Sequence, residues 1–287
     1  MSKNDSTMSN GKAWALILGS SSGFGGATAI ELSRLGINIF GVHFDRAATM
    51  PQVNEIIEKI KKNKVNVVFF NINAADEKSR GKAIEQIKKT MGQEEGSYVK
   101  VLMHSLAFGS LGPFFGKNAA DSLTQKQVEM TLDVMANSLV YWAQAVFFAG
   151  LFKRGSRVFA MTSSGGHTVL PNYGAVSASK AALESHIRQI AMELGPYGVT
   201  ANSIMAGVTD TPALRKIPNS KQMLSIAVRK NPSGRPTKPE DVARAIALLC
   251  DDRATFISGN LIGVDGGEDI VSYIGQLSPN DLGDGSI

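Results

Sequence analysis

The sequence alternates short runs rich in valine, isoleucine and leucine with longer segments of helical periodicity, and this alternation is the strongest constraint on the fold. Parallel strands need crossover connections that bring the chain back to the same end of the sheet, and helices usually provide them. The pattern therefore predicts an α/β fold, doubly wound, with a seven-stranded parallel sheet flanked by helices. The expected strands are residues 13–18, 37–43, 65–71, 99–103, 157–162, 199–205 and 261–264.

No internal repeat, low-complexity tract or proline-rich linker interrupts this alternation. We therefore expect one domain at 12–268, with flexible tails at 1–11 and 269–287. The first tail is polar and lacks the apolar core of a signal peptide. The apolar stretch 134–152 is short for a membrane span, and we expect a long helix buried against the sheet or against a partner subunit.

Composition argues against several classes of protein. The net charge is +5, but the lysines are scattered, so solvated helix faces explain them better than nucleic-acid binding. Cys250 is the single cysteine, which excludes a disulfide framework and fits a reducing cytoplasm. His167 and His186 lack carboxylate or cysteine partners at metal-ligand spacing, so we expect no metal site.

A glycine-rich turn follows the first expected strand and leads into a helical segment. It reads Gly-Ser-Ser-Ser-Gly-Phe-Gly at 19–25. Glycines here let backbone N–H groups approach a diphosphate, and the start of the helix adds a partial positive charge. A plain turn into a helix is the alternative. The position after the first strand of an α/β alternation favours a dinucleotide site.

Tyr173 and Lys180 form the candidate catalytic pair. In a helix they would lie within about 20° of each other around the axis and roughly 10 Å apart along it, so both could line one cleft. Lys180 would lower the pKa of the phenol and hold a cofactor hydroxyl, while Tyr173 donates a proton to substrate. An ordinary buried helix with both side chains on one face would show the same spacing.

The spacing Gly-x3-Gly-x-Gly resembles that of the short-chain dehydrogenase/reductase family, and agreement extends from about residue 12 to 268. The resemblance implies a Rossmann fold, a nicotinamide cofactor and a homotetramer joined through two helices and the last strand. The agreeing segments are His-Ser-Leu-Ala at 104–107, Thr-Ser-Ser-Gly at 162–165, the stretch 202–211 and Gly-Val-Asp-Gly-Gly at 263–267.

Two departures narrow the resemblance. Ordinary members carry the catalytic tyrosine four residues before the lysine, and here that position is Val176. The asparagine of the usual catalytic tetrad falls at Met135, with Asn137 two positions away. These changes resemble the divergent branch that contains the bacterial enoyl-acyl carrier protein reductases, which use Tyr-x6-Lys, as Tyr173 and Lys180 do.

The displaced tyrosine has a physical rationale. In carbonyl reduction, hydride and proton reach adjacent atoms. In reduction of a conjugated thioester, hydride adds to the β carbon while negative charge collects on the thioester oxygen, two carbons further along. The hydrogen-bond donor must move with that charge, and a tyrosine one helical turn earlier provides the displacement.

The resemblance assigns a role to each matched residue. Tyr173 would donate a hydrogen bond to the enolate oxygen, and Lys180 would bind the nicotinamide ribose. Ser163 stands seventeen residues before the lysine, the customary offset of the catalytic serine, and either contacts substrate or orders the loop before Tyr173. The residues expected at the cofactor are Gly19, Ser21, Ser22, Gly23, Phe24, Gly25, Asp45, Arg46, Asn71, Ile72, Ser105, Leu106, Ala107, Lys180, Gly207, Thr209 and Thr211.

The end of the second expected strand bears on the choice of cofactor. An acid there favours a free ribose diol, whereas an arginine favours a 2′-phosphate. His43 stands where an NAD-selecting aspartate often falls, Arg46 could reach a phosphate, and Asp45 could bind a diol. The arginine favours NADPH, with NADH kept as the alternative. Asn71 and Ile72 stand where an Asp-Val pair commonly frames adenine.

The leading hypothesis is a cytoplasmic NAD(P)H-dependent enoyl-thioester reductase of fatty-acid or related acyl synthesis, with the acyl group on acyl carrier protein or coenzyme A. A substrate-binding loop is expected at about 208–232, and an apolar loop with Phe108, Leu111, Phe114 and Phe115 could accept an acyl chain. Two alternatives stay open: a reductase of another conjugated or carbonyl small molecule, such as a polyketide or secondary metabolite, and a non-catalytic NAD(P)-sensing protein.

Overall fold

The computed structural model describes residues 12–272 and confirms the predicted sheet. All seven strands are parallel neighbours in the order β3-β2-β1-β4-β5-β6-β7. The expected tail 1–11 and residues 273–287 of the second tail lie outside the described residues. The strands are β1 Ala13–Leu18, β2 Asn38–His43, β3 Val67–Asn71, β4 Tyr98–His104, β5 Arg157–Thr162, β6 Thr200–Ala206 and β7 Leu261–Val264.

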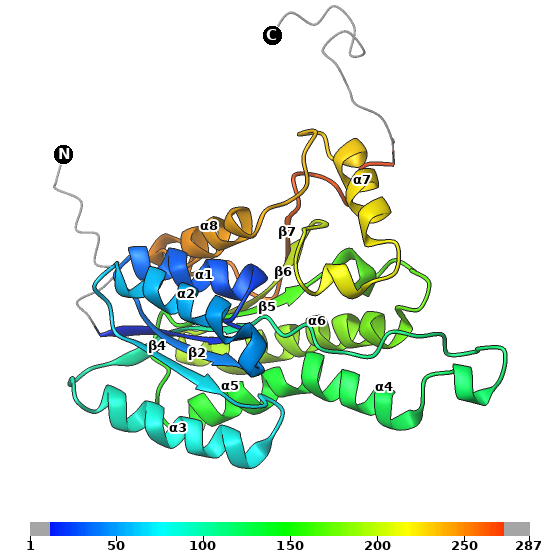
Figure 1. The fold of residues 1–287 in the computed structure, drawn as a ribbon. Helices are drawn as coiled ribbons and strands as arrows, with labels where there is room; N and C mark the ends of the chain where they lie inside the picture. Colours follow the sequence, from blue (N-terminus) through cyan, green and yellow to red (C-terminus); the bar gives the residue numbers. More distant parts are fainter. Residues whose placement is uncertain (1–11, 273–287) are drawn as a thin grey trace, which may run out of the picture.

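Helices cover both faces of the sheet (Figure 1). Helices α1, α2 and α8 lie on one face, and α3, α5 and α6 lie on the other. Helix α7 stands away from both layers, in the segment between β6 and α8. The helices are α1 Gly23–Arg34, α2 Met50–Lys61, α3 Glu77–Met91, α4 Gln125–Leu132, α5 Ser138–Phe148, α6 Gly174–Leu194, α7 Ser220–Lys230 and α8 Pro239–Leu249.

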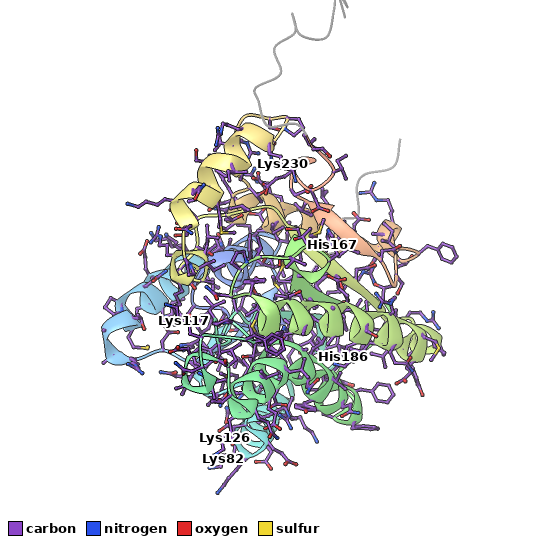
Figure 2. All side chains as sticks on the ribbon, turned by 90° about the vertical axis from the view of Figure 1, so that its right-hand side faces the viewer. Lys82, Lys117, Lys126, His167, His186 and Lys230 are labelled. Carbon is purple, nitrogen blue, oxygen red and sulfur yellow. The ribbon has the colours of Figure 1, made fainter. Side chains whose placement is uncertain are left out.

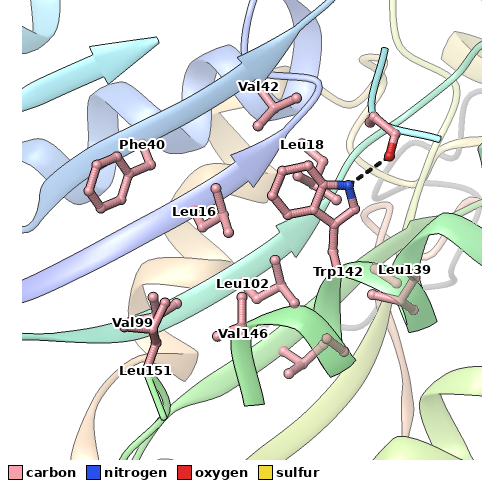
Figure 3. Packing of buried hydrophobic residues seen from close by; sticks show 14 of the residues in the cluster. Leu16, Leu18, Phe40, Val42, Val99, Leu102, Leu139, Trp142, Val146 and Leu151 are labelled. Atoms are coloured by element: carbon pink, nitrogen blue, oxygen red, sulfur yellow. Dashed lines mark hydrogen bonds between the residues drawn. The ribbon is translucent and has the colours of Figure 1, made fainter. Parts of the chain in front are cut away.

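The central strand β1 explains how two cores form. All six of its side chains are buried, as expected for a strand covered on both faces. Successive side chains point to opposite faces, so Trp14, Leu16 and Leu18 join one apolar cluster while Ala13, Ala15 and Ile17 join the other. Figure 3 shows the first cluster, in which the Trp142 Nε1–H donates to the carbonyl of Ala74 at 2.8 Å.

The apolar stretch 134–152 is helical as far as Phe148, and it belongs to one unbroken helical run of α4, a π-helical turn and α5 over residues 125–148. A π-helical turn, Asp133–Asn137, precedes α5, and α5 ends at Phe148. Gly150 adopts a left-handed backbone (φ +70°), which turns the chain towards β5. No helix in the described part of the chain is both long and apolar enough to cross a membrane.

The sheet topology fixes where a ligand can bind. From β1 the chain moves outward to β2 and β3, then returns to β4 on the other side of β1 and continues to β7. The connections after β1 and β4 therefore diverge, and open α/β sheets bind ligands at the carboxyl ends of strands at such a point. The backbone N–H of Ser105 donates to the carbonyl of Leu18, so the ends of the two strands are held side by side.

Candidate active site

The glycine-rich turn 19–25, here called the glycine cradle, is packed so tightly that Gly19 and Gly25 have no room for a Cβ atom. A Cβ atom on Gly19 would lie 2.4 Å from the Ser105 carbonyl oxygen, and one on Gly25 would lie 2.1 Å from that of Gly19. Gly19 and Gly23 also have left-handed backbones, with φ +88° and +51°. The Ser22 side chain does not cap α1, and the first turn of α1 carries no acid. These features fit an anionic diphosphate at the helix start.

The ends of β2 and β3 bring together the residues expected at the adenosine. The carboxylate of Asp45 lies 3.0 Å from Nδ1 of buried His43. Asp45 and Asn71 are joined twice, since the Asp45 N–H donates to Asn71 Oδ1 and Asn71 Nδ2 donates to the Asp45 carbonyl. Burial acts to raise the pKa of Asp45, but hydrogen bonds from side chains, including that of Ser21 in the glycine cradle, lower it overall. Arg46 is exposed.

Lys180 is buried at the carboxyl end of β5. Its ammonium donates to the carbonyl of Met161 at 2.8 Å, and the residue is 6% exposed. Burial lowers the pKa of Lys180 to about 8, while the nearby Glu184 carboxylate acts in the opposite direction. The ammonium has two further N–H donors beyond the one used on Met161.

Tyr173 precedes the first residue of α6 rather than lying inside the helix. It is the N-cap, and its carbonyl accepts from the Ser177 N–H at 2.8 Å. Its ring lies over Gly165, where a Cβ would be 2.6 Å from Tyr173 Cε1 and 3.3 Å from Ser163 Oγ. The pKa of the phenol is raised by burial, and Ser163 only partly opposes the rise. The expected lowering by Lys180 is not found, so the phenol stays protonated and able to donate.

The positions that differ from ordinary family members are apolar packing contacts. Val176 is 5% exposed and Met135 is 2% exposed. Both pack on Gly109, where a Cβ would lie 2.8 Å from Met135 Sδ and 3.3 Å from Val176 Cγ2. The side-chain oxygen of Asn137 lies 3.2 Å from His186 Nε2. Tyr173 is therefore the tyrosine that reaches the Ser163 segment.

The loop after β6 meets the glycine cradle. Thr211 Cγ2 would lie 3.5 Å from a Cβ on Gly23, and the Thr211 hydroxyl accepts from the Leu214 N–H. The Thr209 hydroxyl donates to the carbonyl of Gly207 at 2.9 Å. The structure thus brings Thr211 of this loop next to the turn that could hold a diphosphate.

The remaining expected residues differ in exposure and contacts. Leu106 Cδ2 lies 3.4 Å from the Cβ position of Gly19, and Ile72 donates its N–H to the carbonyl of His43. Phe115 is 95% exposed and Phe108 is 58% exposed, so the apolar loop offers aromatic rings to solvent near α6. Ser21, Ser22, Phe24 and Ser105 are half-buried, Ala107 is exposed, and Met223, Leu224 and Ile226 of α7 are half-buried.

Sequence reasoning did not find two polar contacts beside the catalytic pair. His104 ends β4 fully buried, with Nε2 2.9 Å from the hydroxyl of Ser138, which donates to the carbonyl of Val134. Burial, followed by the charge of Lys180, lowers the pKa of His104 to about 3, so the imidazole is neutral. No local pattern marks this pair, because its members are 34 positions apart.

The second missed contact joins β5 to α6. The Thr162 hydroxyl donates to Glu184 Oε1 at 2.6 Å, across 22 positions of sequence. Glu184 stands one helical turn after Lys180, a spacing that places both on one face. That spacing was a usable signal. Within residues 12–272, no group of three or more His, Cys, Asp or Glu side chains could hold a metal ion.

Comparisons with known proteins bear on this geometry. Residues 19–268 match the family model described as Enoyl-(Acyl carrier protein) reductase. The NADH-dependent enoyl-acyl-carrier-protein reductase of Buchnera aphidicola subsp. Baizongia pistaciae is 29% identical over 233 residues, which is 81% of this chain and 84% of that protein. The cyclohexanol dehydrogenase of Rhodococcus sp. (strain TK6) is 26% identical over 270 residues, covering 88% of this chain and 94% of that one.

Among solved structures, the NADH-dependent enoyl-acyl-carrier-protein reductase of Aquifex aeolicus VF5 is similar to this chain with a TM-score of 0.78. The match covers 91% of this chain and 98% of that one at 23% sequence identity. At this identity the likeness supports the fold rather than the activity.

Proposed function

Because the chain belongs to the short-chain dehydrogenase/reductase family, of the enoyl-(acyl carrier protein) reductase type, we propose that it reduces the 2,3 double bond of a 2-enoyl thioester. The observation that carries the proposal is the position of the phenol. Tyr173 lies beside Ser163, while buried Val176 fills the place of the tyrosine that serves carbonyl reduction.

The residues present fit a nicotinamide dinucleotide. The glycine cradle excludes side chains and offers the uncapped start of α1 to a diphosphate. Lys180 would hold the nicotinamide ribose through its two remaining N–H groups, and residues 207–211 would hold the carboxamide end. When bound, the reduced cofactor supplies the hydride.

The chain's own groups would then act on the thioester oxygen, where negative charge collects. The Tyr173 phenol, kept protonated by its raised pKa, donates a hydrogen bond to that oxygen. The ammonium of Lys180 adds a positive charge in a buried site, where its effect on a developing anion is larger than in water. Ser163 Oγ is buried and has no hydrogen-bond partner among the described residues, so it is free to bind substrate or the phenol.

The contacts at Asp45 bear on the cofactor, and on them we base a preference for NADH. The carboxylate of Asp45 contacts His43, the Asp45 backbone is joined to the Asn71 side chain, and the lowered pKa of Asp45 keeps the carboxylate ionised. An ionised carboxylate beside the glycine cradle accepts hydrogen bonds from a ribose diol and repels a 2′-phosphate. We therefore propose NADH, whereas Arg46 favoured NADPH in the sequence analysis.

Exposed apolar surfaces support the homotetramer that the family resemblance implies. On α5 and α6, Phe148 is 79% exposed and Met192 is 64% exposed. Near α8 and β7, Leu248 is 75% exposed and Phe256 is fully exposed. Phe147 packs edge-on against both Phe148 and Tyr197, and apolar side chains gathered at a surface in this way commonly mark protein interfaces. We also propose that the protein is cytoplasmic, because its single cysteine, Cys250, is a buried free thiol.

The test compares Tyr173→Phe with the wild type and with Tyr197→Phe, a control that removes the same hydroxyl from an exposed tyrosine after α6. Absorbance at 340 nm is followed with NADH or NADPH and with crotonyl or longer 2-enoyl thioesters. We expect turnover of the enoyl thioesters, a loss of about 10²-fold or more in Tyr173→Phe, and no loss in the control.

Acetoacetyl thioester is the discriminating substrate, since its ketone requires a donor at the Val176 position. Reduction of acetoacetyl thioester at a rate equal to that of crotonyl thioester would overturn the proposal and favour a carbonyl reductase. Cofactor binding without turnover of any thioester would instead favour another conjugated substrate or a sensing role.

A further inference from the structure

A turn at residues 265–269, here called the C-terminal turn, directly follows β7 and has a fixed conformation. The Asp265 carboxylate accepts from the backbone N–H groups of Gly267 at 3.0 Å and Asp269 at 2.8 Å. Gly266 and Gly267 are both left-handed, with φ +66° and +84°. Asn231 Nδ2 donates to the Asp265 carbonyl at 2.7 Å and ties the turn to the segment after α7. The side chains of Glu268 and Asp269 within this turn therefore point in fixed directions.

Glu268 points into the end of β6. Its residue is 8% exposed, and its two carboxylate oxygens lie 3.2 and 3.3 Å from the backbone nitrogen of Val208. A Cβ on Gly207 would lie 2.8 Å from Glu268 Oε2, so the carboxylate rests directly on the backbone there. Burial raises the pKa of Glu268, and the Val208 N–H partly opposes the rise.

This buried carboxylate has no salt-bridge partner within residues 12–272. Among the described residues, the hydrogen-bond donor to this carboxylate is the backbone N–H of Val208. Val208 belongs to the loop 207–211, which also carries Thr209 and Thr211. A buried polar group is costly unless it is hydrogen-bonded, so Glu268 and Val208 depend on each other. Without Glu268, the Val208 N–H would lose the acceptor that fixes the start of this loop.

The neighbouring residue gives the C-terminal turn a second attachment. Asp269 Oδ2 lies 3.0 Å from Nε2 of His167, in the loop that follows Ser163. Figure 2 places His167 on the face formed by the carboxyl ends of the strands, between Lys230 of α7 and His186 of α6. The C-terminal turn thus contacts the loops after β5 and after β6, the two loops that flank the catalytic pair.

We propose that Glu268 is a positioning residue for the cofactor: by accepting the Val208 N–H, it holds loop 207–211 in the conformation that meets the glycine cradle. The contact of Thr211 with the Gly23 position depends on that conformation. The inference rests on the proposed function only for the identity of the bound dinucleotide. It concerns a residue outside the sites expected from sequence, which ended at Thr211.

Two variants of equal length separate the hydrogen bond from packing. Glu268→Gln retains an oxygen acceptor and loses the charge, whereas Glu268→Met fills a similar volume and accepts no hydrogen bond. Glu85→Met, on the exposed face of α3, is the matched control for a surface substitution. If acceptance by the side chain positions the loop, the glutamine variant resembles the wild type and the methionine variant does not.

The first readout is hydrogen–deuterium exchange in the protein without cofactor. We expect peptides that contain Val208 to exchange about tenfold faster in Glu268→Met, the effect of losing one hydrogen bond to a buried N–H. Peptides from β1 and α1 should exchange at wild-type rates. Glu268→Gln should stay within about twofold of the wild type by the same reasoning.

The second readout is the dissociation constant of NADH, followed by its fluorescence without any thioester. We expect about tenfold weaker binding in Glu268→Met and near wild-type binding in Glu268→Gln and Glu85→Met. Equal behaviour of the methionine and glutamine variants, in either readout, would overturn the inference. If the protein reduces no enoyl thioester, the proposed function is wrong, but hydrogen exchange and NADH binding can still be measured. Failure of the proposed function is therefore distinguishable from failure of this inference.

Discussion

The two ends of strand β5 each hold a buried cation, and the two cations differ in how their hydrogen bonds are used. At the amino end, Arg157 is 1% exposed and donates from all three nitrogens to the carbonyls of Leu249, Gly155, Ser156 and Asp251. At the carboxyl end, Lys180 is 6% exposed. Among the described residues, its ammonium makes one hydrogen bond, which it donates to the carbonyl of Met161.

The difference separates a structural cation from a functional one. The Arg157 guanidinium donates hydrogen bonds to carbonyls at the carboxyl end of α8 and in the turn before β5. Each of its three nitrogens is therefore bonded to the protein. The ammonium keeps two donors that no described residue uses, so the cost of its burial is only partly offset. Burial alone therefore does not mark a cation as a catalytic candidate, whereas unused hydrogen-bonding capacity does.

The largest expected effect comes from Lys180→Met. Removal of a donor and a charge from the reacting centre should lower kcat/KM by about 10³-fold. The free energy of unfolding should not fall, because the variant removes a buried charge and fills the same space. Steady-state kinetics and urea unfolding check both parts. A large loss of stability would make Lys180 a structural residue and remove the contrast with Arg157.

Arg157→Met should have the opposite signature. Four carbonyls lose the hydrogen bond from Arg157, and those of Ser156 and Asp251 keep a backbone N–H donor, so we expect the free energy of unfolding to fall by about 3 kcal/mol. In the fraction that remains folded, kcat/KM should stay within about twofold of the wild type, since Arg157 lies at the far end of the strand. Urea unfolding followed by circular dichroism measures the first quantity. Lost activity at unchanged stability would contradict the assignment.

The pH dependence of stability sharpens the comparison. Folding lowers the pKa of Lys180 from 10.5 to about 8, so between these values the unfolded chain binds a proton that the folded chain has released. The wild type should therefore gain stability relative to Lys180→Met as pH rises from about 8 to 10.5, by up to about 3 kcal/mol. Unfolding curves of both proteins without cofactor, measured across this range, provide the check. Parallel curves would contradict it.

The smallest effect is expected at Lys100, a second buried cation near the amino ends of the strands, on β4. Lys100 is buried, but its partner Asp252, 2.9 Å away, is 71% exposed. Water screens the carboxylate, so Asp252→Asn should lower the free energy of unfolding by less than about 1 kcal/mol and leave kcat/KM unchanged. Thermal unfolding at low and high salt measures this quantity. A loss as large as that of Arg157→Met would place the stabilising network around Lys100 instead.

The fold was predictable because periodicity is local. The limits of β1, β5 and β7 agree with the sequence prediction, since in each the apolar run is bounded by polar residues or glycine. The predicted start of β3 at residue 65 was wrong by two residues. Lys64 has a left-handed backbone (φ +59°) that ends the turn at residues 62–64, and regular pairing with β2 begins at Val67. The π-helical turn before α5 has no sequence signal that we could use.

The candidate site was predictable only where a motif carried it. The glycine cradle and the Tyr173–Lys180 spacing follow from short segments, and the structure places both at the same end of the sheet. Contacts across the fold could not be read from sequence. The direction of the Tyr173 pKa shift, the neutral imidazole of His104 and the approach of Glu268 to Val208 all depend on burial that long-range packing creates.

The packing of the two tryptophans has a spectroscopic consequence. Trp14 and Trp142 are the chain's only tryptophans, and both lie in the apolar layer between the sheet and α3, α5 and α6. Trp14 is stacked on Phe40 with ring centroids 4.0 Å apart. Shielded from water, both indoles should emit at short wavelengths, and their emission overlaps the absorbance of reduced nicotinamide. Intrinsic fluorescence can therefore report the integrity of this layer in every variant, and its quenching can report a bound cofactor, in the same cuvette.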